Sequence, residues 1–301
     1  MRYRRFGRTE LQVSAVSLGG AYLRGKDPER AEENARAIVQ RALDLGCNYI
    51  DTAPLYGASE ELLGKALAEE RRPFYLATKV GFKPEDFDYR RDSVLQSLER
   101  SLTLLGLTKL TVAQIHEVNM AGWERIVEKG GTLEGLRAAQ KQGLCDFIGV
   151  TGRAIPLLAR LAATGEFDTV LCYHDYHPCV QLAAEEVLPA AAQSDMGVVL
   201  ATVLAGGMYV AGKDQRAAVE RRFEDEEEQQ RAWATIARLE QEESTLPQSA
   251  FRWVLADERV STVSSGAASV AELEEVVQAG ASGRTEILSE RCFDSAALRS
   301  A

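Results

Sequence analysis

The chain has 301 residues, 46% of them apolar, with a formal net charge of −10 and a sequence pI near 5.1. This length and apolar content are enough for a large core, and we expect residues 1–301 to form a single domain. Nucleic acid and anionic membrane surfaces repel an acidic protein, so we expect neither as a partner and expect a small-molecule substrate instead. We expect a monomer or a small homo-oligomer.

Five scattered cysteines, an odd number without a C-x-x-C pair, predict neither a disulfide framework nor a structural zinc site. They indicate a reducing, cytoplasmic location. The basic N-terminus is not followed by an apolar stretch, and no run approaches the roughly 20 apolar residues of a membrane span. We therefore expect no membrane partner.

Two short extended pieces between Tyr3 and Val13 open the chain, joined by a turn that contains Gly7. We interpret this segment as an N-terminal β-hairpin that caps a barrel floor. Eight β-branched and aliphatic runs follow, at residues 15–18, 48–51, 74–79, 110–116, 147–151, 169–173, 197–201 and 260–264.

Amphipathic stretches with helical spacing separate these runs, at residues 28–45, 89–105, 132–142, 153–163, 181–194 and 269–278. In the first of them, Asp27 is a candidate N-cap, Pro28 takes the first helical position and Gly46 ends the helix. Eight β–α units with near-continuous apolar strands predict an α/β fold of the (β/α)8 TIM barrel type. The alternative, a doubly wound open sheet, is disfavoured because no strand-to-helix junction carries G-x-G-x-x-G.

Residues 202–246 form the longest insertion between predicted strands, from a Gly206-Gly207 loop through a charged run at residues 220–228. We interpret that run as the solvated face of a helix, with a regulatory or partner-binding surface as the alternative.

Three consecutive predicted strands end in polar groups, namely Asp51, Lys79 and His116. The carboxyl ends of parallel barrel strands meet at one rim, which is where barrel enzymes place catalytic groups. Tyr56 follows the first of these strands in a loop bounded by a proline and a glycine. The sequence therefore predicts one pocket that holds all four side chains.

These four groups suit proton transfer to or from a carbonyl or alcohol oxygen. A nearby ammonium from Lys79 stabilises the phenolate of Tyr56 and lowers its pKa from the ordinary value of about 10. Asp51 can serve as the counter-ion of Lys79, and His116 can orient the substrate oxygen. Such a device fits hydride transfer with a nicotinamide, in which Tyr56 exchanges the proton as general acid or base.

Each residue also has a purely structural interpretation. Asp51 could be a turn or cap residue, Tyr56 a loop aromatic, Lys79 a surface lysine and His116 a histidine satisfied at a strand end. Their joint placement on successive strands favours catalysis over four separate coincidences.

The quartet and its surroundings resemble the aldo-keto reductase superfamily, whose catalytic Asp, Tyr, Lys and His match these positions. The resemblance spans nearly the whole chain and includes residues 6–9, 13–14, 18–20, 51–57, 59–64, 77–79, 148–152 and 176–178. Residues 148–152 and 171–176 look most like the branch of L-galactose dehydrogenase and D-threo-aldose 1-dehydrogenase (L-fucose dehydrogenase). That branch oxidises the anomeric carbon of sugars to lactones, commonly with NAD. The resemblance implies an NAD-preferring aldose 1-dehydrogenase, with an NADP-dependent reductase of aldehydes or ketones as the alternative.

The resemblance also implies a cofactor site, at Thr151, Gly152, Tyr173, Ala201, Leu204, Gly206, Gly266, Glu272 and Glu275. Thr151 stands where the family places a hydroxyl on the nicotinamide carboxamide, whereas Gly152 and Tyr173 replace an Asn and a Gln. Ala201 stands where many members stack an aromatic ring, and Tyr173 is a candidate substitute for that ring.

The last predicted strand bears on the choice of cofactor. Members that bind the 2′-phosphate carry Lys or Arg at sites matching Gly266, Ala268 or Glu272, and none is basic here. A carboxylate at Glu272 repels a phosphate and can accept a hydrogen bond from a free ribose hydroxyl, so we expect NAD rather than NADP. Glu275 keeps the family's adenine-side carboxylate, whereas Val276 replaces its customary Asn.

Substrate residues are expected on variable loops, where the aromatic residues Tyr22, Phe82 and Trp123 are candidates for contact with a sugar or an aromatic ring.

Two functions of other classes remain open. One is a binding or regulatory protein that keeps the cofactor with little turnover, as in the potassium-channel β-subunit relatives.

The other is a metal-dependent barrel hydrolase that uses Cys172, His174 and His177, with Cys179 nearby. We expect no metal, because His177 and Cys179 follow a turn and need not converge with the strand residues.

Overall fold

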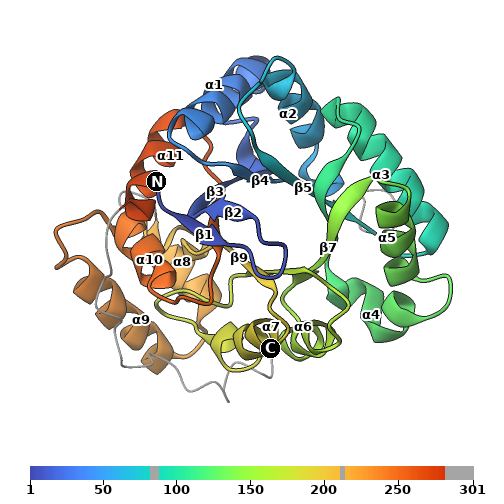
Figure 1. Ribbon diagram of the computed structural model, residues 1–301. Coiled ribbons are helices and arrows are strands. Elements are labelled where there is room, and N and C mark those ends of the chain that lie inside the picture. Colours follow the sequence, from blue (N-terminus) through green and yellow to red (C-terminus); the bar gives the residue numbers. More distant parts are fainter. Residues whose placement is uncertain (82–87, 211–213, 282–301) are drawn as a thin grey trace.

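The computed structural model describes residues 1–81, 88–210 and 214–281, and its centre is a closed parallel barrel (Figure 1). The barrel order is β10-β3-β4-β5-β6-β7-β8-β9. Its strands are β3 (Val16–Gly19), β4 (Tyr49–Asp51), β5 (Tyr75–Val80), β6 (Leu110–Ile115), β7 (Cys145–Gly152), β8 (Thr169–Tyr173), β9 (Gly197–Ala201) and β10 (Thr262–Ser265). All eight predicted strands are present, and the predicted (β/α)8 fold is confirmed.

Helices surround the barrel, as Figure 1 shows. They are α1 (Ala31–Asp44), α2 (Ser59–Leu67), α3 (Arg91–Leu105), α4 (Val118–Val127), α5 (Thr132–Lys141), α6 (Ile155–Ala163), α7 (Val187–Gln193), α8 (Gln215–Arg222), α9 (Glu226–Leu239), α10 (Leu246–Leu255) and α11 (Val270–Val277). Short 3-10 turns are η1 (Gly20–Tyr22), η2 (Pro28–Arg30), η3 (Pro54–Tyr56), η4 (Leu182–Ala184), η5 (Ala205–Gly207) and η6 (Gln278–Gly280). None of the helices in the described ranges is both long and apolar enough to cross a membrane.

The helices differ from the prediction at several boundaries, and helices α4 and α10 were not among the predicted helical stretches. Asp27 caps the short turn η2, where its carboxylate accepts from the backbone N–H of Glu29, and α1 begins only at Ala31. Helix α4 was not predicted, because Gly122 adopts a left-handed conformation (φ 72°) in its middle and interrupts the apolar periodicity.

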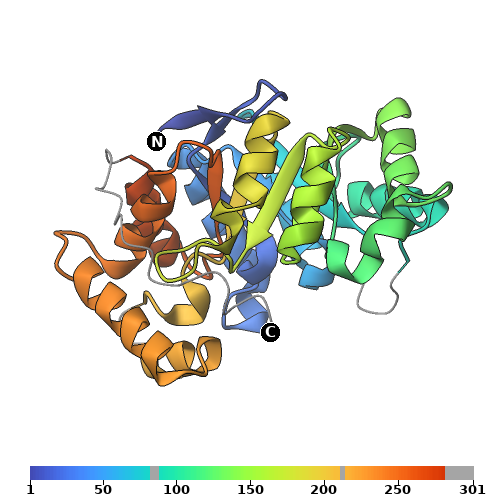
Figure 2. The same cartoon turned by 90° about the horizontal axis from the view of Figure 1, so that it is seen from below.

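The N-terminal hairpin closes the floor of the barrel, as predicted. It consists of β1 (Tyr3–Arg5) and β2 (Gln12–Ser14) and lies at the top of Figure 2. The fully buried side chains of Phe6 and Val13 join the apolar cluster inside the barrel. Since this cluster fills the lower barrel, polar groups have room only toward the opposite rim.

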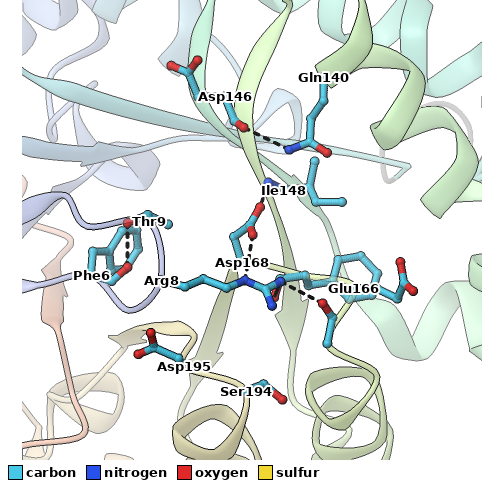
Figure 3. Close-up of polar contacts among 12 residues, drawn as sticks. Phe6, Arg8, Thr9, Gln140, Asp146, Ile148, Glu166, Asp168, Ser194 and Asp195 are labelled. Carbon is cyan, nitrogen blue, oxygen red and sulfur yellow. Dashed lines mark hydrogen bonds and ion pairs between the residues drawn. The ribbon is translucent and has the colours of Figure 1, made fainter.

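Arg8 fastens the hairpin turn to the barrel (Figure 3). Its guanidinium donates to the carboxylate of Asp168 at 2.9 Å and to the carbonyls of Gly165 and Phe167 at 2.9 and 2.6 Å. Asp168 also accepts from the backbone N–H of Ile148 at 3.0 Å, so one carboxylate joins the hairpin to β7.

Replacing Arg8 by methionine should lower the free energy of unfolding by about 1–3 kcal/mol, because Asp168 and two carbonyls lose their charged donor. Urea denaturation measures this change. Arg30→Met is the matched control, since its pair with Glu33 is two-thirds exposed (67% each) and should contribute little to stability. Equal effects of the two substitutions would contradict this account.

The insertion after β9 forms a second, smaller core. Tyr209 and Phe223 are fully buried there with Met208, beside apolar residues of α8 and α9. The charged run at residues 220–228 does not form one helix face, because α8 ends at Arg222 and α9 begins at Glu226. Phe223 turns inward between them, and the carboxylate of Asp225 caps α9.

Candidate active site

The strand register brings three predicted site residues to one rim of the barrel. Asp51 ends β4 and pairs with Ala77, and Lys79 of β5 pairs with Gln114 of β6. His116 directly follows β6. Tyr56 ends the turn η3 just beyond Asp51. All four predicted residues line one cavity of about 530 Å³.

A buried ion pair anchors this group. The Lys79 ammonium lies 2.5 Å from Oδ2 of Asp51 and donates to the carbonyl of Thr52 at 2.8 Å. Lys79 is 1% exposed and Asp51 is 3% exposed, so water screens the pair very little. The Tyr56 ring centroid lies 4.8 Å from Nζ of Lys79 and 5.8 Å from the His116 ring, which it meets edge-on.

Burial and neighbouring charges set the protonation of these groups. Burial raises the pKa of Tyr56, and the opposing effect of the Lys79 ammonium does not overcome it. Lys79 thus lowers the pKa of this phenol as expected, but burial outweighs its effect and the net shift is upward. Burial lowers the pKa of Lys79, but the charges of Asp51 and Tyr56 outweigh burial, and the net shift is upward. The ammonium is thus retained at neutral pH.

His116 is held neutral. Burial and the nearby Lys79 ammonium lower the pKa of its imidazole to about 2. A neutral imidazole beside the phenol can donate a hydrogen bond to a substrate oxygen without adding charge.

Gln114 is a fifth residue of this site, and the sequence analysis missed it. Its side-chain amide is fully buried and donates to Oδ1 of Asp51 at 2.8 Å. Oδ2 then remains for Lys79. The two-residue period of a strand could have identified Gln114, because side chains two positions apart, such as Gln114 and His116, point to the same face.

The variant Gln114→Leu should lower kcat/KM by about 10–100-fold, an effect typical of removing a partner that orients a reacting group. The rise of kcat/KM with pH should also shift to higher pH in this variant. The reason is that a loosened Asp51 holds the Lys79 ammonium less firmly against Tyr56, which raises the pKa of the phenol. The matched control is Gln140→Leu, whose amide donates to the backbone of Asp146 outside the barrel (Figure 3). A lower rate with an unmoved pH profile would contradict a positioning role for Gln114.

The predicted cofactor residues lie along the same cavity, with one exception. Those that line it are Thr151, Tyr173, Ala201, Leu204, Gly206, Gly266, Glu272 and Glu275. Gly152 is not among them: a Cβ there would meet Val118 at 3.1 Å, at the start of α4. Thr151 Oγ1 is buried without a hydrogen-bond partner in the described part of the chain, so it suits a ligand amide.

The three substrate candidates separate in space. Tyr22 lines the cavity beside Gly266, where an added Cβ would lie 2.9 Å from its ring. Trp123 lies on α4 under the guanidinium of Arg160, 3.6 Å from its ring centroid, and is not among the lining residues. A contact between Trp123 and the substrate stays a prediction. Phe82 lies outside the described residues.

The histidines of the metal hypothesis have other neighbours. His174 lines the cavity, whereas His177 is buried beneath the insertion with Nδ1 3.0 Å from the Tyr209 hydroxyl. The described residues contain no group of three or more His, Cys, Asp or Glu arranged to hold a metal ion. The hydrolase hypothesis therefore has no metal site in that part of the structure.

Comparison with known proteins agrees with this geometry. The family model described as "Aldo/keto reductase family" matches residues 15–286. The chain belongs to the aldo-keto reductase family. It is therefore an oxidoreductase with a small-molecule substrate and a nicotinamide cofactor, as members of this family are.

Two curated relatives match this aldo-keto reductase over most of its length. The L-galactose dehydrogenase of Arabidopsis thaliana is 30% identical, with 92% of this chain and 87% of the relative covered. The D-threo-aldose 1-dehydrogenase of a Pseudomonas species is 25% identical, with 87% and 88% covered. An aldo-keto reductase of Bacillus halodurans in its holo form shares the fold, with a TM-score of 0.75, 24% identity, and 95% and 92% of the chains covered.

Proposed function

We propose that this aldo-keto reductase is an NAD-preferring aldose 1-dehydrogenase, which oxidises the anomeric hydroxyl of a sugar to a lactone. The observation that carries the proposal is the arrangement of Tyr56, Lys79, Asp51 and His116 around one cavity that continues to Glu272. A site of this kind moves a hydride at one substrate carbon and a proton at the oxygen bonded to that carbon. The relatives named as sugar dehydrogenases support the choice of substrate class.

In this mechanism each residue of the quartet has one task. A bound nicotinamide supplies the hydride acceptor. Tyr56 takes the hydroxyl proton at its phenolic oxygen, and the Lys79 ammonium stabilises the phenolate that accepts it. Asp51 holds Lys79 in place, and neutral His116 donates a hydrogen bond that orients the substrate oxygen.

The walls of the cavity fit a nicotinamide dinucleotide. The buried hydroxyl of Thr151, which has no partner among the described residues, would bind the carboxamide. A side chain at Gly206 would meet nothing within 4 Å, which leaves open backbone for a pyrophosphate beside the insertion.

Charges along the cavity support the preference for NAD. Lys79 is the sole Lys or Arg that lines the cavity in the described ranges, and it is already paired with Asp51. At the opposite end, Glu272 accepts from the backbone N–H of Ala268 at 2.9 Å, which holds its carboxylate at the start of α11. A 2′-phosphate there would meet a like charge and no cation.

The variant Glu272→Lys should raise the ratio of kcat/KM with NADP to kcat/KM with NAD by about tenfold or more, because a phosphate would gain a cation and lose a carboxylate. Steady-state kinetics with both cofactors measures this ratio. Glu240→Lys makes the same change at the exposed end of α9 and should leave the ratio unchanged. Equal ratios in the two variants would show that the 2′ position of the adenosine ribose does not lie beside Glu272.

The substrate proposal is tested by following reduced-nicotinamide absorbance with NAD and NADP in parallel. The panel is L-galactose, L-fucose, D-arabinose, pyridoxal and a reactive aromatic aldehyde. We expect oxidation of at least one sugar with NAD preferred. Reduction of the aldehyde with NADP alone would overturn both the substrate class and the cofactor preference.

A further inference from the structure

Glu117 is a charged residue on the wall of the cavity that the proposed mechanism does not use. It directly follows His116 and lines the cavity with Tyr56, Tyr173 and His174. Its negative charge acts on Tyr56, because it is among the groups that raise the pKa of that phenol. A substrate bound beside Tyr56 therefore shares the cavity with this carboxylate.

The backbone of Glu117 is held in an unfavourable conformation. Its φ of 52° and ψ of 69° are left-handed, which costs a non-glycine residue free energy. The buried Tyr89 hydroxyl fixes this conformation by donating to the carbonyl of His116 at 2.9 Å, with the carbonyl of Glu117 at 3.3 Å. Strain of this kind persists where the surroundings over-determine it, and it often marks a functional site.

One carboxylate oxygen of Glu117 is occupied and the other is available. The Tyr173 hydroxyl donates to Oε1 at 2.6 Å. In the described part of the chain, no hydrogen bond reaches Oε2 and no Lys or Arg forms an ion pair with Glu117. Tyr173 thus orients an uncompensated carboxylate, which offers an acceptor beside the reacting groups.

We propose that Glu117 determines substrate charge: it accepts a hydrogen bond from a substrate hydroxyl near the reacting carbon and disfavours phosphate and carboxylate groups there. The preferred substrates are then neutral polyhydroxylated compounds rather than sugar phosphates or sugar acids. This inference rests on the proposed function, since it concerns the substrate of the same site. The preference for neutral substrates results from charge, because a partly buried carboxylate attracts hydroxyl donors and repels anions.

The test compares two molecules with the same carbon skeleton, L-glyceraldehyde and L-glyceraldehyde 3-phosphate. Glu117→Gln keeps an acceptor for Tyr173 and removes the charge. We expect it to move the ratio of kcat/KM toward the phosphate by about tenfold. Glu124→Gln removes an exposed charge from helix α4, which begins directly after Glu117, and should leave the ratio unchanged.

A binding measurement makes the result independent of turnover. In a Tyr56→Phe background, each molecule is titrated into the NADH complex and NADH fluorescence is followed, with and without Glu117→Gln. The ratio of dissociation constants should shift in the same direction by about tenfold. If no compound supports nicotinamide turnover, the proposed function fails, and the binding ratio still decides the role of Glu117.

Tyr173→Phe separates a direct role of the charge from a structural one. This variant removes the hydroxyl that Glu117 accepts but keeps the carboxylate, so the preference for the neutral molecule should remain. The inference is overturned if Tyr173→Phe shifts the ratio as much as Glu117→Gln does. It is also overturned if Glu117→Gln leaves the ratio within about twofold of the unaltered protein in the binding measurement.

Discussion

Replacing Tyr56 by phenylalanine should lower kcat by about 10²–10⁴-fold, because the substrate oxygen loses its proton acceptor. The dissociation constant for NADH should change by less than about twofold, since the quartet holds the reacting oxygen and not the bulk of the cofactor. Stopped-flow absorbance and NADH fluorescence measure the two quantities. A regulatory protein that only binds the cofactor would show no change in either.

The matched control for this variant is Tyr3→Phe, which removes an exposed hydroxyl that donates to the carbonyl of Gly46 on the barrel floor. Its kcat should match that of the unaltered protein.

The pH profile of turnover is a second check. Burial and Lys79 lower the pKa of His116 to about 2, so the profile should show no inflection near pH 6–7. Sugar oxidation should instead rise continuously toward alkaline pH, because burial raises the pKa of Tyr56 and deprotonation is what oxidation requires.

Replacing Lys79 by methionine should cost both activity and stability. Asp51, 3% exposed, would lose its cation, and among the described residues the amide of Gln114 would be its remaining side-chain partner. An uncompensated buried charge of this kind lowers the free energy of unfolding by about 3–5 kcal/mol. Turnover should fall at least as far as in Tyr56→Phe, because the phenolate loses the ammonium that stabilises it.

A double variant separates these two effects. Asp51→Asn combined with Lys79→Met removes both charges, so most of the lost stability should return while turnover stays as low as in Lys79→Met alone. Lys65→Met serves as the control, since its pairs with Glu32 and Glu61 are about half-exposed and contribute little. Recovery of turnover in the double variant would show that the ion pair is only structural.

The sequence predicted the strands and the rim residues well for a physical reason. A barrel strand buried on both faces is a compact apolar run, and a polar side chain at its end is conspicuous, as with Asp51, Lys79 and His116. Gln114 and Glu117 escaped notice because one lies inside the same run and the other directly after it. Their meaning depends on which neighbours the register brings close, and the register comes from the closed sheet.

Loop residues were less predictable. Trp123 was expected on a variable loop, but its segment forms α4, and the indole packs against Arg160. The direction in which the pKa of Tyr56 shifts was also not predictable. The sequence indicates that a lysine is near the phenol, but burial of the phenol, which has the larger effect on its pKa, depends on the folded chain.

The most direct test of the central claim is transfer of deuterium from the anomeric carbon of 1-deuterio-L-galactose to NAD, analysed by mass spectrometry of both products. The account predicts a deuterated reduced nicotinamide and a lactone without deuterium, both formed about 10²–10⁴-fold more slowly with Tyr56→Phe. Lactone formation with the deuterium released to water, or transfer that persists undiminished in Tyr56→Phe, would contradict it.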